Sequence, residues 1–219
     1  MSKPKLISFK VCPFVQRSVI LLKEKGVDYD IEYIDVYNPP EWFLKLSPTG
    51  KVPIMQVEGT VLFESAVINE YIDEVYPPQI HPADPLLKAQ NRAWIEYTSP
   101  LYMGTFNIIM SKKKEDMEKA LEEFDKNLAG LEKAKQHKPW FNGEQLSMVD
   151  ISAAPIFTRI SFIKDHCKQD LLKAYPALQQ WSDDLLQRQT VKDSVVDGFS
   201  DLLFNRMKDN ESYILKNES

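Results

Sequence analysis

Cys12 lies where a predicted strand passes into a predicted helix, and of all the side chains it is the best placed for nucleophilic chemistry. Pro13 follows it, and proline suits a first helical position because the N–H of that residue has no partner within the helix. A thiol at a helix N-terminus faces unpaired N–H groups and the positive end of the helix dipole. The sequence therefore predicts a nucleophilic cysteine with a pKa below the usual value of about 8.5.

Cys12 has an alternative, purely structural interpretation, since a cysteine outside a disulfide is among the most buried residue types and commonly acts as a small hydrophobic residue. Position 15 is Val15, so no second cysteine stands at C-x-x-C spacing. Redox chemistry at Cys12 would therefore take its second sulfur from a small thiol. The other cysteine, Cys167, is far away in the sequence and is expected to be structural.

The composition is that of an ordinary globular protein: 219 residues, of which 43% are hydrophobic and 27% charged. A net charge of -5 argues against a nucleic-acid surface or an anionic membrane as partner. No apolar run approaches the roughly 18 residues of a membrane span, and the first residues lack a signal-peptide pattern. Two distant cysteines favour a reducing compartment over a disulfide framework. The predicted location is the cytoplasm.

Strand and helix patterns alternate over the first 76 residues in the order β-α-β-α-β-β-α. The predicted elements are a strand at 6–9, a helix at 13–25, a strand at 28–35, a helix at 41–46, strands at 53–57 and 61–63, and a helix at 64–76. The first strand, helix and strand most simply form a right-handed parallel βαβ unit. This half of the chain is predicted to be an α/β domain.

A proline-rich connector over residues 77–86 predicts a domain boundary, which gives a first domain at 1–80 and a second at 86–219. Strand patterns end there, and the second domain is predicted to be all-helical. The predicted helices lie at 86–110, 115–135, 151–164 and 175–187, with one more from 197 onward. The large apolar residues expected to face inward on the first of them are Trp94, Tyr97, Leu101 and Phe106.

The clearest local signal in the second domain is a capping box. The Ser147 hydroxyl is expected to accept from the N–H of Asp150, and the Asp150 carboxylate from the N–H of Ser147. This cap would fix the start of a buried helix at Ile151. Pro100 and Pro155 fall inside predicted helices and are expected to bend them.

Four short motifs occur in an order that resembles the cytosolic glutathione transferases, and in particular their omega class, whose nucleophile is a cysteine. The motifs are Cys12-Pro13-Phe14, Pro40-Glu41-Trp42-Phe43, Lys51-Val52-Pro53 and Phe63-Glu64-Ser65-Ala66. The similarity spans nearly the whole chain. It implies a thioredoxin-like N-terminal domain, an all-α helical-bundle C-terminal domain and a homodimer.

The resemblance also implies that glutathione is the co-substrate. The residues that would surround it are Phe14, Lys51, Val52, Pro53, Glu64 and Ser65. In the family the Val-Pro peptide is cis, and the backbone of Val52 would pair with the tripeptide. Ser65 at a helix N-terminus suits the γ-glutamyl carboxylate, and Glu64 suits the ammonium group. The alternative for these last two residues is plain helix capping.

Pro39 stands where omega-class proteins often carry a lysine that contacts glutathione, and Lys51 is the residue that could replace this contact. Tyr97 and Trp181 are expected to line the second-substrate pocket, with helix–helix packing as their alternative role. The histidines occur singly, without the spacing of metal ligands, so no metal is predicted. They are His81, His137 and His166.

The function that the resemblance implies is a glutathione-dependent thiol transferase or oxidoreductase of the thioltransferase, dehydroascorbate reductase or glutathionyl-substrate reductase type, with weak conjugation. The Cys12 thiolate would form a mixed disulfide that a second glutathione resolves, and the other substrate would be a small oxidised or electrophilic molecule. The alternative is a non-enzymatic adaptor on the same fold. Stringent starvation proteins, which bind RNA polymerase, and intracellular chloride channel proteins are of this kind. Gln16, Arg17 and Lys23 argue against membrane insertion of the Cys12 helix.

Overall fold

The computed structural model describes residues 2–136 and 138–217. The first part of the chain has the predicted order β-α-β-α-β-β-α, and the ends of its elements differ by at most two residues from those predicted. The elements are β1 (Lys5–Ser8), α1 (Pro13–Glu24), β2 (Asp30–Tyr33), α2 (Glu41–Leu46), β3 (Ile54–Val57), β4 (Thr60–Phe63) and α3 (Ser65–Val75). The α/β prediction for this domain is confirmed.

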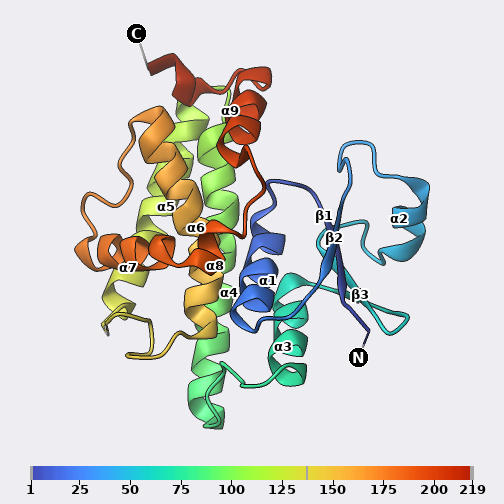
Figure 1. Cartoon of the computed structure of the whole chain (residues 1–219). Helices are drawn as coiled ribbons and strands as arrows, with labels where there is room; N and C mark the ends of the chain where they lie inside the picture. Colours follow the sequence, from blue (N-terminus) through green and yellow to red (C-terminus); the bar gives the residue numbers. More distant parts are fainter. Residues whose placement is uncertain (1, 137, 218–219) are drawn as a thin grey trace.

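The four strands form one mixed sheet in the order β2-β1-β3-β4. β1 runs parallel to β2 and antiparallel to β3, and β4 is antiparallel to β3. Helices α1 and α3 lie between the sheet and the helical part, whereas α2 lies on the opposite side (Figure 1). Because successive strand residues face opposite sides, Leu6 joins the main core and Ile7 joins a small cluster with Phe43 of α2.

The second part of the chain is helical, as predicted. Its helices are α4 (Pro85–Met110), α5 (Lys114–Ala134), α6 (Met148–Cys167), α7 (Pro176–Gln187), α8 (Gln189–Lys192) and α9 (Phe199–Asp209), followed by a 3-10 helix at Tyr213–Asn217. The two shortest were not predicted, because four or five residues are too few to show a helical period. Within residues 2–136 and 138–217, no helix is long and apolar enough to cross a membrane.

The capping box at the start of α6 is confirmed. The Asp150 carboxylate accepts from the N–H of Ser147 at 2.7 Å, and the Ser147 hydroxyl accepts from the N–H of Asp150 at 3.4 Å. The predicted start of this helix at Ile151 is wrong, because a cap at Ser147 makes Met148 the first helical residue. α6 runs on through Pro155 to Cys167.

A buried ion pair and its neighbouring hydrogen bonds tie the end of α1 to α3 and to the segment between α3 and α4. The Lys25 ammonium lies 2.8 Å from the Asp73 carboxylate, and both side chains are 1% exposed. Lys25 also donates to the carbonyls of Tyr76 and Pro78, while Asp73 accepts from the N–H of His81. The chain between α3 and α4 is therefore held against α1, which in turn contacts α6.

Candidate functional site

Cys12 lies at the junction of β1 and α1, as predicted, and is the N-cap residue of α1. Its N–H donates to the carbonyl of Phe9 at 3.1 Å, and its carbonyl accepts from the N–H of Gln16 at 3.3 Å. Pro13 fills the first helical position. The backbone thus places the thiol beside the free N–H groups of the first turn.

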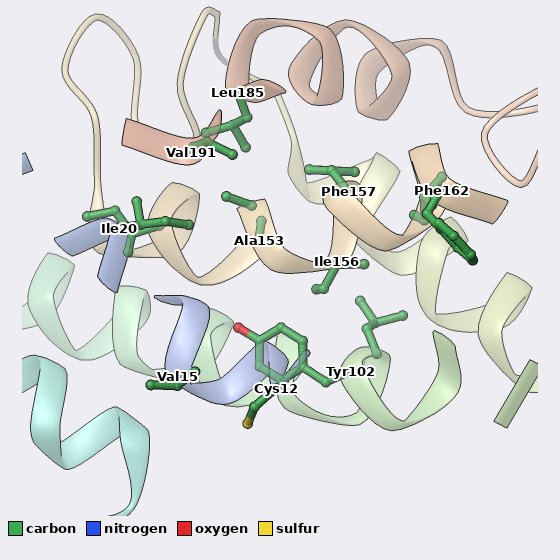
Figure 2. Close-up of a cluster of buried hydrophobic side chains, with 14 of the residues drawn as sticks. Cys12, Val15, Ile20, Tyr102, Ala153, Ile156, Phe157, Phe162, Leu185 and Val191 are labelled. Atoms are coloured by element: carbon green, nitrogen blue, oxygen red, sulfur yellow. The ribbon is translucent and has the colours of Figure 1, made fainter. Parts of the chain in front are cut away.

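The Cys12 side chain is nevertheless almost wholly buried, with 2% of the residue exposed. It lies at the edge of a hydrophobic cluster, and its sulfur points away from the other labelled side chains (Figure 2). Burial raises the pKa of Cys12 above its ordinary value, and the Ser8 hydroxyl, the N–H of Val15 and the charge of Arg159 oppose this rise without reversing it. The predicted low pKa is therefore wrong, because it counted the helix terminus and omitted desolvation of the thiolate.

This pKa shift has a measurable consequence for the protein without glutathione. Because burial raises the pKa of Cys12, the thiolate should form only as the pH rises above about 8.5. A titration of the ultraviolet thiolate absorbance, with the Cys12→Ser variant subtracted, measures this directly. A midpoint below about pH 7 would show that the helix terminus outweighs burial.

Arg159 of α6 supplies a buried positive charge close to Cys12, and it was not among the predicted site residues. It is 4% exposed, and burial lowers its pKa to about 10, so it stays charged at neutral pH. Its guanidinium donates to the carbonyl of Val11 at 2.7 Å and to the side chain of Gln16 at 2.7 Å. The sequence does carry a signal for it: Arg159 is the one cation between Ile151 and Ile163 in an apolar run.

Arg17 is a second buried cation that was not predicted to be a site residue. It lies on α1 and is 3% exposed. Its Nε and Nη2 atoms donate to the Ser65 hydroxyl oxygen at 3.1 and 2.5 Å, and Nη1 donates to Ser152 of α6 at 3.3 Å. Because Ser65 accepts both bonds, its own hydroxyl hydrogen remains available to donate.

All six residues predicted to surround glutathione line one cavity of about 330 Å³, which we call the first cavity. They are Phe14, Lys51, Val52, Pro53, Glu64 and Ser65, and they are joined by Thr49, Phe63 and Met103. The Val52–Pro53 peptide is cis, as predicted. The volume falls within the usual range for ligand clefts. Residues from four separate segments of the chain are thus brought together beside the N-terminus of α1.

Glu64 has an unusual backbone at the edge of the first cavity. Its φ of 63° and ψ of 110° lie in a region that residues other than glycine rarely occupy, at a cost of order 1–3 kcal/mol. Such strained residues cluster at binding sites, where the surrounding structure holds them in place. This backbone conformation coincides with the edge of the first cavity and with the N-cap position of α3.

A smaller cavity of about 40 Å³ lies between the β1–α1 turn and helices α4, α6 and α9, and we call it the second cavity. Six of its lining residues are Pro13, Tyr102, Phe106, Arg159, Leu203 and Arg206. The rings of Phe14 and Tyr102, whose centroids lie 4.9 Å apart, stand between the two cavities. Phe106, predicted to face inward, is 38% exposed and lines this cavity.

Tyr97 and Trp181, predicted to line the second-substrate pocket, line neither the first nor the second cavity. Trp181 is fully buried, and its indole N–H donates to Asp150 at 2.7 Å. Tyr97 faces α5, where its hydroxyl donates to the carbonyl of Asn127. Both residues hold helices together, which is the alternative role that their sequence positions allowed.

Metal ligands are not grouped in the described ranges: no three or more His, Cys, Asp or Glu side chains there could share an ion. His81 bonds to Glu70, and His166 stacks on Phe162. His137 lies outside the described residues. Cys167 is 9% exposed at the end of α6 and is not in a disulfide.

Comparison with known proteins gives consistent matches over both parts of the chain. Residues 11–75 match the family model of the glutathione S-transferase N-terminal domain, and residues 114–184 match that of the C-terminal domain. Glutathione S-transferase omega-1 of Rattus norvegicus is 34% identical over 181 residues, which are 81% of this chain and 74% of the rat protein.

Two further comparisons agree. The probable glutathione S-transferase DHAR1, cytosolic, of Oryza sativa subsp. japonica is 35% identical over 159 residues, which are 72% of this chain and 70% of the rice protein. The crystal structure of glutathione transferase Omega 3C from Trametes versicolor superimposes with a TM-score of 0.78 at 28% identity, covering 90% of each chain. With both domain models matched in order and an omega-class relative above 30% identity, the protein belongs to the glutathione S-transferase family.

Proposed function

We propose that this transferase works through Cys12 as a glutathione-dependent thiol transferase, reducing the disulfide between glutathione and a small substrate. One observation above all supports the proposal: six residues predicted from separate motifs to surround glutathione line a single cavity next to the α1 N-terminus. Because Phe14 and Ser65 are far apart in the sequence, chance does not readily explain why these residues line the same cavity.

The first cavity offers complementary groups for the γ-glutamyl end of glutathione. The Ser65 hydroxyl accepts from Arg17 and so can donate its hydrogen to a carboxylate, with the positive charge of Arg17 behind it. Glu64 supplies a carboxylate for the ammonium group. Lys51, also on the cavity wall, provides a positive charge for the second carboxylate of the tripeptide.

The chemistry uses two disulfide exchanges. The Cys12 thiolate attacks the glutathione sulfur of the mixed disulfide, so that a Cys12–glutathione bond forms and the substrate leaves as a thiolate that takes up a proton. A second glutathione thiolate then attacks the glutathione sulfur bonded to Cys12. Oxidised glutathione leaves and the Cys12 thiolate is regenerated. In sum, one free glutathione is oxidised, the substrate is released as a thiol, and the glutathionyl group that it carried ends in oxidised glutathione.

Both steps need the Cys12 sulfur to be charged and reachable. The positive charge of Arg159 and the first-turn N–H groups partly offset the rise in the pKa of Cys12 that burial causes. Because the residue is 2% exposed, we propose that the α1 N-terminus opens locally when a disulfide enters the first cavity.

Incubation with oxidised glutathione tests the proposal. We expect intact-mass measurement to show one glutathionyl group per chain, located on Cys12 by peptide mapping and removed by excess reduced glutathione. An unmodified chain, or modification confined to Cys167, would contradict it. That result would favour the alternative of a non-enzymatic adaptor, for which the burial of Cys12 is the supporting observation. Homodimer formation and a cytoplasmic location stay predictions.

A further inference from the structure

Arg206 of α9 is held in the wall of the second cavity by three aromatic rings. Its guanidinium carbon lies 5.1 Å from the ring centroid of Tyr37, 5.7 Å from that of Phe9 and 5.8 Å from that of Phe106. These rings come from three separate segments: the β2–α2 loop, the β1–α1 turn and α4. Cation–π contacts with all three fix the position of the charge.

The guanidinium has an unused hydrogen-bond donor. Nη2 donates to the Tyr37 hydroxyl, whereas Nε is buried and has no hydrogen-bond partner among residues 2–136 and 138–217. A buried donor without a partner is unfavourable. A ligand acceptor could therefore bond to Nε without breaking an existing hydrogen bond of the protein. The planar fork of arginine matches a carboxylate in particular.

The second cavity carries positive charge that its own wall does not neutralise. Arg159 and Arg206 both line it, and among the described residues of its wall there is no Asp or Glu. Arg159 already donates to the carbonyls of Val11 and Pro155 and to Gln16. Arg206 is therefore the cation of this wall that keeps an unpaired buried donor, its Nε. This local positive charge stands out in a protein whose net charge is -5.

The rest of the wall is apolar or aromatic, including Phe9, Ile109 and Leu203. At about 40 Å³, the second cavity is much smaller than the usual ligand cleft, so a substrate must displace side chains at its mouth. Tyr37 and Phe106, at 76% and 38% exposure, are the solvent-facing rings around Arg206.

We propose that Arg206 selects the second substrate, favouring molecules that carry a carboxylate on an aromatic or other apolar body. The carboxylate pairs with the guanidinium, and the apolar body occupies the second cavity while glutathione occupies the first. This inference rests on the proposed function for the placing of glutathione, but it can be tested by binding alone, without any reaction at Cys12.

The test compares two unreactive thioethers, S-(para-carboxybenzyl)glutathione and S-(para-carbamoylbenzyl)glutathione, by isothermal titration calorimetry. They differ only in whether the ring carries a charged acid or a neutral amide. The wild-type protein should bind the acid about tenfold more tightly, as one charge-assisted hydrogen-bonded pair provides. In Arg206→Met the two should bind within about twofold of each other, with the amide unaffected.

Lys208→Met is the matched control, because Lys208 lies on the same helix and contacts Phe204 without lining the second cavity. It removes the same charge and should leave the preference for the acid intact. The inference is overturned if the wild type binds both compounds equally or binds neither, if Arg206→Met keeps the preference, or if Lys208→Met abolishes it. Failure of the proposed function would be seen in a different experiment: Cys12 would form no adduct with oxidised glutathione, regardless of how the two thioethers bind.

Discussion

Replacing Cys12 with serine is expected to lower glutathione-dependent disulfide reduction by at least about a thousandfold. Removing a covalent nucleophile costs several orders of magnitude in rate, and a serine hydroxyl cannot hold the mixed disulfide on which the two exchanges depend. The measurement is kcat/KM for reduction of a glutathione mixed disulfide, together with intact mass after exposure to oxidised glutathione. The variant should gain no glutathionyl group.

The Cys12→Ser protein should still fold, so that a loss of activity can be assigned to the missing thiol and not to unfolding. Cys12 is the N-cap of α1 and makes no side-chain capping bond, while serine is a favoured N-cap residue. Retention on immobilised glutathione should also persist, because the first cavity is lined by other residues. Cys167→Ser serves as the control and should keep full activity. A Cys12→Ser protein that still reduces disulfides at the wild-type rate would remove Cys12 from the mechanism.

Asp150→Ala should destabilise the folded protein severely, by about 3–6 kcal/mol. The buried carboxylate accepts four hydrogen bonds, at 2.6–2.8 Å, from the N–H and hydroxyl of Ser147, the N–H of Phe141 and the indole of Trp181. Alanine would leave these buried donors without an acceptor, each at about 1–3 kcal/mol, and would also remove half of the capping box.

Urea unfolding followed by circular dichroism measures this loss. Asp183→Ala provides the control, since Asp183 is exposed on α7 and its carboxylate accepts from Gln179 on the same helix; we expect a change within about 0.5 kcal/mol. Should Asp150→Ala not fold at all, Ser147→Ala gives a milder variant, with an expected loss of about 1–2 kcal/mol. A loss below about 1 kcal/mol for Asp150→Ala would contradict the central role of this carboxylate.

Local patterns in the sequence were sufficient for the order of the strands and of the helices of six or more residues. The helical spacing of Val15, Val19 and Leu22 and the capping box at Ser147 and Asp150 depend on residues within a few positions of one another. Cys12-Pro13 likewise marks the start of α1 by itself. The family motifs led to the six residues of the first cavity. The domain boundary between residues 77 and 86 stays a prediction.

Tertiary structure decided which side chains are buried and which charges meet. The pKa of Cys12 rises because packing around it removes water, which a helix-start pattern does not describe. Arg159 approaches Cys12 from α6, and Arg206 meets Tyr37 and Phe9 from α9. The Trp181 side chain is part of the hydrophobic core because the surrounding helices bury it and its indole N–H donates to Asp150. Each of these outcomes depends on contacts between residues far apart in the chain, and the spacing of neighbouring residues carries no information about such contacts.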